Sequence, residues 1–247
     1  MDASENNGKD AANKARAKRA FGKMVLALAC FLALDVVLLM LNLAASLDIS
    51  GDALTINLAG RQRMLSQSMA KSVLQVDIDA ARGLGNRAAL TELKNASVLF
   101  DTTLKGLKQG AFTTGSDDKS VFLPALKSPE GLEIVARAEA IWLPYKALLT
   151  PLMKQTKVGD EHFSADQLIV LEWYARENNL KLLDLMNDLT THLEQLANAK
   201  AQRMLWAQAL GLLLIFLNCG YLVSQYRVYS RAKVPFRSVH HSLHGNW

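Results

Sequence analysis

The chain has 247 residues, of which 50% are hydrophobic and 21% are charged, and its formal net charge is +5. A composition this apolar excludes a disordered chain, and this many charges exclude a chain embedded entirely in a membrane. Two cysteines are too few for a disulfide scaffold or for a multi-cysteine metal site.

Two long apolar segments are the first organised feature of the chain. Residues 24–46 carry a single charge, Asp35, and residues 204–223 carry none. Each segment has about the 20 residues that a helix needs to cross the bilayer core. The first is longer than the apolar region of a signal peptide, which has about 7 to 15 residues, so we expect an uncleaved anchor. The sequence therefore predicts two transmembrane helices.

The positive charges predict how these helices are oriented. The tail 1–23 has a net charge of +3 and the tail 224–247 has +4, whereas the segment 47–203 between the spans has −1. Basic residues beside a span stay in the cytoplasm. We therefore expect both termini inside the cell and residues 47–203 outside. Short basic tails of this kind favour anionic lipid as their partner and give no support to nucleic-acid binding.

A carboxyl group inside a span is costly and usually faces a partner. Asn218 lies at a similar depth to Asp35, so one interpretation is a hydrogen bond between the two spans. The alternative is a protonated Asp35 that faces a neighbouring chain.

The exported segment has the 3.6-residue period of helices and no alternation long enough to predict a strand. The first helix continues from the first span to about residue 81 and carries an apolar stripe. A second helix begins after Asn86 as N-cap and ends at Gln109, before Gly110 in the left-handed position that ends helices. Residues 110–128 are predicted to form a long loop. The stripe of the first helix is Leu54, Leu58, Leu65, Met69, Val73 and Val76.

The third helix begins at Ser128 with a proline in its first turn. Pro144 and Pro151 are expected to kink it or to divide it. A capping box at 164–167 opens a fourth helix that runs into the second span. The fold class is therefore all-α, an antiparallel four-helix bundle between two transmembrane helices. The apolar seam of the fourth helix is Leu171, Leu182, Leu185, Leu189 and Leu196.

One face of the first helix lacks the many lysines and glutamates that are typical of a solvated surface. At 100° per residue, the side opposite Leu58 holds Ile56, Gly60, Arg63, Gln67 and Ala70. A glycine within a helix costs about 1 kcal/mol relative to alanine, which favours close approach by another helix. If two copies meet on this face, two guanidinium groups face each other, and a planar oxyanion between them relieves their repulsion. The alternative is a solvated arginine beside an ordinary glycine.

The run from Ile56 to Gln67, INLAGRQRMLSQ, resembles the signature of the PilJ/NarX-like sensor domain, found in type IV pilus chemotaxis transducers and nitrate/nitrite sensor kinases. The resemblance implies a protein of the bacterial inner membrane whose helical bundle lies in the periplasm and is dimeric. It also implies that Arg63 is the anion-binding arginine, with Gly60 one turn before it. Asn57 and Ala59 complete the motif and the implied dimer face.

The chain departs from the family pattern in two places. Ser68 stands where related motifs often have a second basic residue, and Lys71 or Arg61 replaces it only by bending to the same face. The residues after the second span are too few for the usual HAMP linker and output module. His240, His241 and His244 in that tail are interpreted as part of a disordered end and not as a metal site.

Three functional hypotheses follow, none of them enzymatic, since no catalytic constellation or cofactor motif is present in the sequence. The first is a small-oxyanion sensor that signals through the membrane to a separate partner. The second is an assembly subunit of a chemotaxis or pilus-related receptor complex, and the third is a truncated transducer. A homodimer is the expected partner, and no cofactor or metal is expected.

Overall fold

The computed structural model describes residues 2–83, 87–115, 117–154 and 165–233. The chain divides into two compact units, and each is described by itself. The terminal unit contains residues 1–46 and 201–247, and the central unit contains residues 47–200. Each of the two long helices contributes one segment to each unit.

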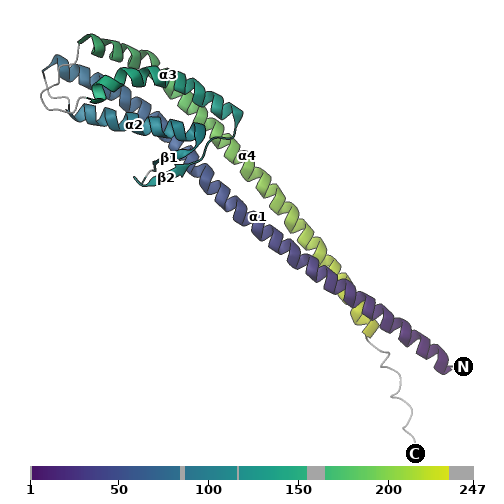
Figure 1. The fold of residues 1–247 in the computed structure, drawn as a ribbon. Helices are drawn as coiled ribbons and strands as arrows, with labels where there is room; N and C mark the ends of the chain where they lie inside the picture. Colours follow the sequence, from purple (N-terminus) through teal and green to yellow (C-terminus); the bar gives the residue numbers. More distant parts are fainter. Residues whose placement is uncertain (1, 84–86, 116, 155–164, 234–247) are drawn as a thin grey trace, which may run out of the picture. The chain divides into compact units, whose positions relative to one another are not determined.

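Four helices account for most of the described chain, as expected of an all-α protein (Figure 1). A two-stranded hairpin lies between the second and third helices. The elements are α1 (Asp2–Ala81), α2 (Arg87–Gln109), β1 (Ala111–Thr114), β2 (Ser120–Leu123), α3 (Pro129–Lys154) and α4 (Ala165–Lys233).

The helix ends follow local sequence signals. Gly83 and Gly110 have φ of 64° and 77°, so both adopt the left-handed conformation that favours glycine after a helix. The Gly110 N–H donates to the carbonyl of Gly106 at 2.8 Å. At the start of α3, the Gly131 N–H donates to Ser128 Oγ at 3.0 Å, which confirms the predicted N-cap. The predicted caps at Asn86 and Ser164 lie outside the described residues.

Between α2 and α4 the structure corrects one expectation and decides between two alternatives that the sequence left open. Residues 110–128 are not only a loop, because β1 and β2 pair antiparallel, with Phe112 opposite Phe122. Strands of four residues are too short for an alternating pattern to stand out in the sequence. The third helix is not divided either, since α3 contains both Pro144 and Pro151.

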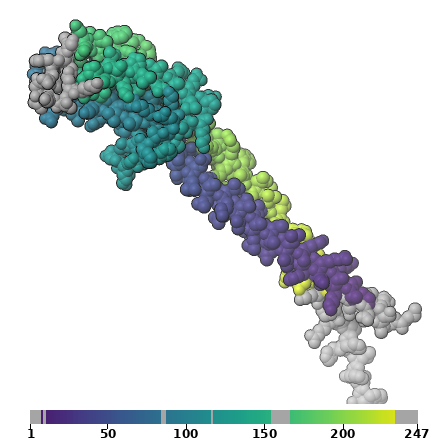
Figure 2. Space-filling view, in the orientation of Figure 1, coloured from purple at the N-terminus to yellow at the C-terminus, as the bar shows by residue number. Residues whose placement is uncertain are grey.

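The hairpin is fixed to α2 by close packing. Leu123 is fully buried, and a Cβ added to Gly106 would come within 3.0 Å of its Cδ2 atom. The hydroxyls of Thr103 and Thr113 are hydrogen-bonded at 3.0 Å. The outer side of the hairpin carries the exposed apolar side chains of Phe112 and Phe122. In Figure 2 the hairpin stands out from the surface of the central unit.

Segments of all four helices share one apolar core in the central unit. Its centre is aromatic: the ring centroids of Phe100 and Trp142 are 4.8 Å apart, and those of Trp142 and Tyr145 are 5.9 Å apart. Trp142 Nε1 donates to Asp101 Oδ1 at 2.9 Å, so the only polar atom of the indole is satisfied. Burial raises the pKa of Tyr145. Of the seam predicted on the fourth helix, Leu196 alone is exposed.

The terminal unit has the opposite pattern, with apolar side chains outside. Its two helices are long and apolar enough to cross a membrane, and only 6% of each apolar window is buried. Between the helices the packing is close, because a Cβ added to Gly211 would collide with the side chain of Leu38. Gln208 Nε2 donates to Asn42 Oδ1 across the same contact.

Candidate functional site

A polar seam joins α1 to α4 within the central unit. Gln67 Nε2 donates to Asn179 Oδ1 at 2.8 Å, and the reverse amide contact measures 3.4 Å. One turn earlier on α1, Arg63 Nη1 donates to Asn187 Oδ1 at 3.2 Å. The α1 numbers fall as the α4 numbers rise, so the two helices run antiparallel. Amide pairs of this kind hold the two helices in one particular register.

Arg63 is the exposed cation of this seam. Its Nε lies 3.4 Å from the carbonyl of Gly60, a long contact, so its partners are neutral groups. Within the described residues no carboxylate lies at ion-pair distance from the Arg63 guanidinium. A guanidinium whose contacts are only amide and carbonyl oxygens keeps its full charge available for an anion.

Gly60 is not forced by a neighbouring helix of the same chain. A Cβ at this position would meet only Arg63 Nη2, at 3.6 Å, which is an ordinary contact. The close helix approach that we expected at Gly60 is therefore not made within the chain. It stays a prediction for a second copy.

The remaining residues of the predicted face do not all lie on one surface. Asn57 is exposed, and Ile56 and Gln67 are half-buried. Ala59 is fully buried in the core, and Ala70 is 8% exposed, so neither is available to a partner. The face had been centred opposite Leu58. The buried side of α1 is in fact centred further round the helix, because Gln62 and Ser66 are also inside.

The exposed surface of α1 is instead a stripe whose members alternate in steps of three and four residues. Met64, which the sequence interpretation left out, is 68% exposed at its centre. On α4, the large apolar side chains of Ile169, Trp173 and Leu180 are exposed as well. Steps of three and four are the spacing by which one helix packs along another. We call this set the outer stripe: Asn57, Gly60, Met64, Gln67, Lys71, Leu74 and Ile78.

Arg61, next in the motif to Gly60, has a structural partner that the sequence did not reveal. Its Nη1 donates to the carbonyl of Gly115 at 2.9 Å, and its Nη2 donates to that of Thr114. Burial lowers the pKa of Arg61, and the charge of Asp118 opposes that effect. Arg61 therefore fixes the end of the hairpin and does not reach the Arg63 side.

Gln62 is fully buried, and its amide donates to the carbonyl of Phe100 at 3.0 Å. It ties α1 to α2 at the aromatic centre of the core. A polar residue that faces the core has no hydropathy signal, so only the packed structure identifies its role.

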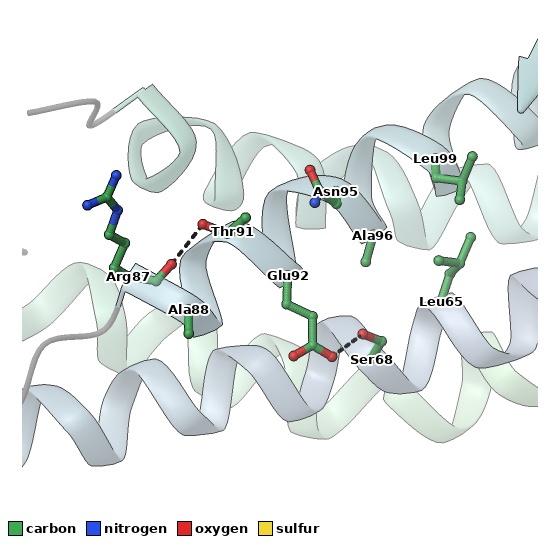
Figure 3. A pocket seen from close by; sticks show the side chains of 9 residues that line it. All are labelled: Leu65, Ser68, Arg87, Ala88, Thr91, Glu92, Asn95, Ala96 and Leu99. Carbon is green, nitrogen blue, oxygen red and sulfur yellow. Dashed lines mark hydrogen bonds between the residues drawn. The ribbon is translucent and has the colours of Figure 1, made fainter. Parts of the chain in front are cut away.

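A groove of about 800 Å³ lies between α1 and α2 (Figure 3). Leu65, Ala96 and Leu99 form its apolar part, and Ser68 Oγ donates to Glu92 Oε1 at 2.9 Å on its polar side. Lys71 Nζ lies 3.5 Å from the same carboxylate oxygen. Ser68 therefore faces α2, so the departure from the family pattern at this position lies away from Arg63.

The predicted pair inside the spans is not formed. Asp35 is half-buried, and no hydrogen bond joins it to Asn218 in the described part of the chain. The Oδ1 atom of Asn218 is buried there without a hydrogen-bond partner. A polar contact between the spans is made instead by Asn42 and Gln208.

No group of three metal-ligating side chains occurs among the residues that the structure describes. The three histidines of the C-terminal tail lie outside those residues.

The comparisons with known proteins find one family. Residues 46–166 match the family described as "Type IV pili methyl-accepting chemotaxis transducer N-term", PilJ. The matched segment contains the motif, the hairpin and α3, whereas the seam partners Asn179 and Asn187 lie beyond it. No curated protein and no solved structure matches the chain.

Proposed function

Taking the PilJ N-terminal domain at residues 46–166 as the premise, we propose that this protein is a membrane-anchored sensor of a small oxyanion, bound by Arg63 where two copies meet. The PilJ family indicates a sensory domain related to chemotaxis and pilus transducers. The ligand, the dimer and the topology are proposals that the contacts of the chain support.

The membrane anchor rests on the exposed apolar surface of the terminal unit. Each apolar window is 6% buried, and a surface of this kind in water would expose about 20 large side chains. Basic tails flank both windows. We therefore propose that α1 and α4 cross the bacterial inner membrane, with both termini cytoplasmic and the central unit periplasmic.

The oxyanion site rests on the charge at Arg63. If two copies pack in parallel along the outer stripe, about a two-fold axis that passes close to the neighbouring Arg63, the two Arg63 side chains meet, because such an axis brings together equivalent residues that lie near it. Their own chains supply no carboxylate among the described residues to compensate them. A planar oxyanion such as nitrate or nitrite accepts hydrogen bonds from both guanidinium groups.

Binding changes the contact between α1 and α4 by competition. In the structure Arg63 Nη1 donates a hydrogen bond to Asn187 Oδ1, with a distance of 3.2 Å between the two atoms. An anion that accepts this hydrogen bond displaces Asn187 Oδ1. The ligand favours the state in which this contact is broken, which is the differential affinity that a signal requires. Since α1 and α4 both continue into the terminal unit, a change in their contact reaches a separate signalling partner.

Calorimetric titration of nitrate and nitrite into the full chain in lipid nanodiscs tests the ligand. We expect saturable heat for the native chain and none for Arg63→Ala. Arg176→Ala is the matched control, because Arg176 is an exposed arginine of α4 whose partner is Glu172. Equal heats in the native chain and in Arg63→Ala would disprove an oxyanion site at Arg63.

Disulfide cross-linking tests the dimer. In a chain with Cys30→Ser and Cys219→Ser, we expect Met64→Cys to cross-link to its twin in membranes. Leu143→Cys on α3 is the control, since it is exposed away from the outer stripe. Equal cross-linking at both positions would show that α1 is not the contact. Gln67→Cys is a weaker probe because Gln67 is bonded to Asn179.

The second candidate is an assembly subunit, and the hairpin favours it. Phe112 is 70% exposed and Phe122 is 55% exposed, with their ring centroids 5.4 Å apart. An exposed aromatic pair is typical of a protein contact. Under this hypothesis, cross-linking in native membranes captures a specific second protein, and a Phe112→Ser, Phe122→Ser variant loses it while nitrate has no effect. Capture of the chain alone would count against assembly.

A further inference from the structure

Three charged side chains join α1 to α4 at the end of the central unit. Lys200 Nζ on α4 lies 2.9 Å from Asp52 Oδ2 and 3.0 Å from Asp52 Oδ1. The same ammonium lies 3.1 Å from Asp48 Oδ2. One lysine therefore contacts two carboxylates of one helix.

The spacing of the two acids sets what this contact permits. Asp48 and Asp52 are four residues apart, so they lie on the same side of α1, about 6 Å apart along its axis. An ammonium group has three donors on a flexible four-carbon stem, which lets it contact both carboxylates or move towards either. The hydrogen bond with Asp52, opposed by burial and helped by the contact with Asp48, raises the pKa of Lys200, so the lysine stays charged near neutral pH.

The other polar contacts between α1 and α4 do not have this freedom. The Gln67–Asn179 and Arg63–Asn187 pairs each join one residue to one residue. If α4 slides along α1 by part of a turn, both of those pairs break. Lys200 loses contact with one aspartate and keeps the other.

We propose that Lys200, Asp48 and Asp52 form a sliding clamp, which keeps α1 and α4 paired while allowing the two helices to shift along each other by about 1 to 2 Å. When Lys200 contacts Asp52 alone, α4 is displaced along α1 in the direction in which the residue numbers of α1 increase. With Lys200 on Asp48 alone, it is displaced towards lower ones. The inference rests on the proposed function only for what drives the shift, which is the anion at Arg63.

The clamp suits a signal because moving Lys200 between its partners costs little. Both aspartates are partly exposed, and ion pairs that water can reach contribute little each. Losing one pair while keeping the other is therefore a small change in free energy. A ligand with modest preference for one register is enough to select it.

Distances between spin labels on α1 and α4 test the clamp without any ligand. The labels go on Ala53→Cys and Asp184→Cys, both exposed, in the full chain with Cys30→Ser and Cys219→Ser. Labelled chains are diluted with unlabelled ones in nanodiscs, so that only distances within one chain are measured. Asp184 on α4 lies near Asn187, which is opposite Arg63, so its level along α1 is at higher residue numbers than Ala53. Sliding of α4 along α1 therefore changes the distance between the two labels.

The two single variants are expected to shift this distance in opposite directions. Asp52→Asn leaves Lys200 on Asp48 and shortens the label distance by about 1 to 2 Å, and Asp48→Asn lengthens it by a similar amount. Asp77→Asn is the matched control, an acid of α1 outside the clamp, and leaves the distance unchanged. The double variant Asp48→Asn, Asp52→Asn broadens the distribution.

Shifts of the same sign in both single variants, or no shift in either, would overturn the clamp. That failure leaves the anion site untouched, because the calorimetric test of Arg63 does not depend on label distances. A flat titration at Arg63 with opposite shifts here would instead keep the clamp and remove the anion as its driver.

Discussion

The two units use the same helices, α1 and α4, with their polarity reversed. In the central unit, Phe100, Met69 and Leu189 have no exposed surface. In the terminal unit the large apolar side chains are exposed, and the hydrogen bond between Asn42 and Gln208 lies between the helices. The contrast teaches that two segments of one helix can be stabilised in different ways. Burial of apolar surface stabilises the segment in water, and packing with a few polar contacts stabilises the segment proposed to lie in lipid.

The strongest test of this comparison removes a core side chain from the central unit. Phe100→Ala is expected to lower the free energy of unfolding by about 3 to 5 kcal/mol, because it empties space beside Trp142. Urea unfolding of the full chain in nanodiscs, followed by tryptophan fluorescence, measures the change. Val98→Ala, on the exposed side of α2, is the control and should change it by less than about 0.5 kcal/mol. Equal effects would contradict the assignment of the core.

A matched pair of lysines tests which solvent each unit faces. Leu213 in the second span is 54% exposed and Leu143 on α3 is 53% exposed. Leu213→Lys is expected to oppose insertion by about 2.5 to 3.5 kcal/mol, whereas Leu143→Lys should change stability by less than about 0.5 kcal/mol. Protease accessibility of a C-terminal tag measures insertion of the span. If Leu213→Lys inserts as well as the native chain, the exposed surface of the terminal unit does not face lipid.

Acid should weaken the central unit through Asp101. Burial opposes ionisation of this carboxyl, but contacts from Lys105, Trp142 and Lys146 outweigh it and hold its pKa below the ordinary 3.8. A group whose folded pKa is lowered adds stability above its unfolded pKa, and that contribution is lost as pH falls through the folded value. We expect this contribution to be lost as the pH falls below the ordinary 3.8, and the loss to be smaller in Asp101→Asn. Parallel unfolding curves for the two proteins from pH 6 to pH 2.5 would refute this role.

Arg61 should control the hairpin locally and leave the rest of the core in place. Arg61→Ala removes the hydrogen bonds to Thr114 and Gly115, so amide exchange in residues 111–123 should become about tenfold faster. Hydrogen exchange with mass spectrometry measures it, and peptides from α3 serve as the internal control. Unchanged protection of the hairpin would mean that packing of Leu123 alone holds it.

The smallest expected effect concerns the polar contact in the terminal unit. Gln208→Leu removes the hydrogen bond to Asn42, and hydrogen bonds between membrane helices average about 0.6 kcal/mol. The midpoint temperature of thermal unfolding in nanodiscs is expected to fall only slightly. A loss as large as that of Phe100→Ala would show that this contact, and not packing at Gly211, holds the helices together.

Features that depend on neighbouring residues along the chain were predictable from the amino-acid pattern. Uninterrupted apolar runs identified the two candidate spans, and Gly110 and Ser128 marked helix ends through backbone conformation and capping. The motif at Ile56–Gln67 led to the PilJ family, and the match at 46–166 confirmed that part of the resemblance. These signals are local, so they need no knowledge of the packed core.

Which side of each helix faces the core, and which faces solvent, became clear from the packed fold and not from the sequence. Gln62 is polar and yet fully buried, so a hydropathy projection placed the centre of the buried side wrongly and put Ala70 on an exposed face, to which the family resemblance added Ala59. The partners of Arg61, Gln67 and Lys200 lie 54, 112 and 148 residues away in sequence. Contacts over such separations form because the helices fold back on one another, and no pattern along a single helix specifies them.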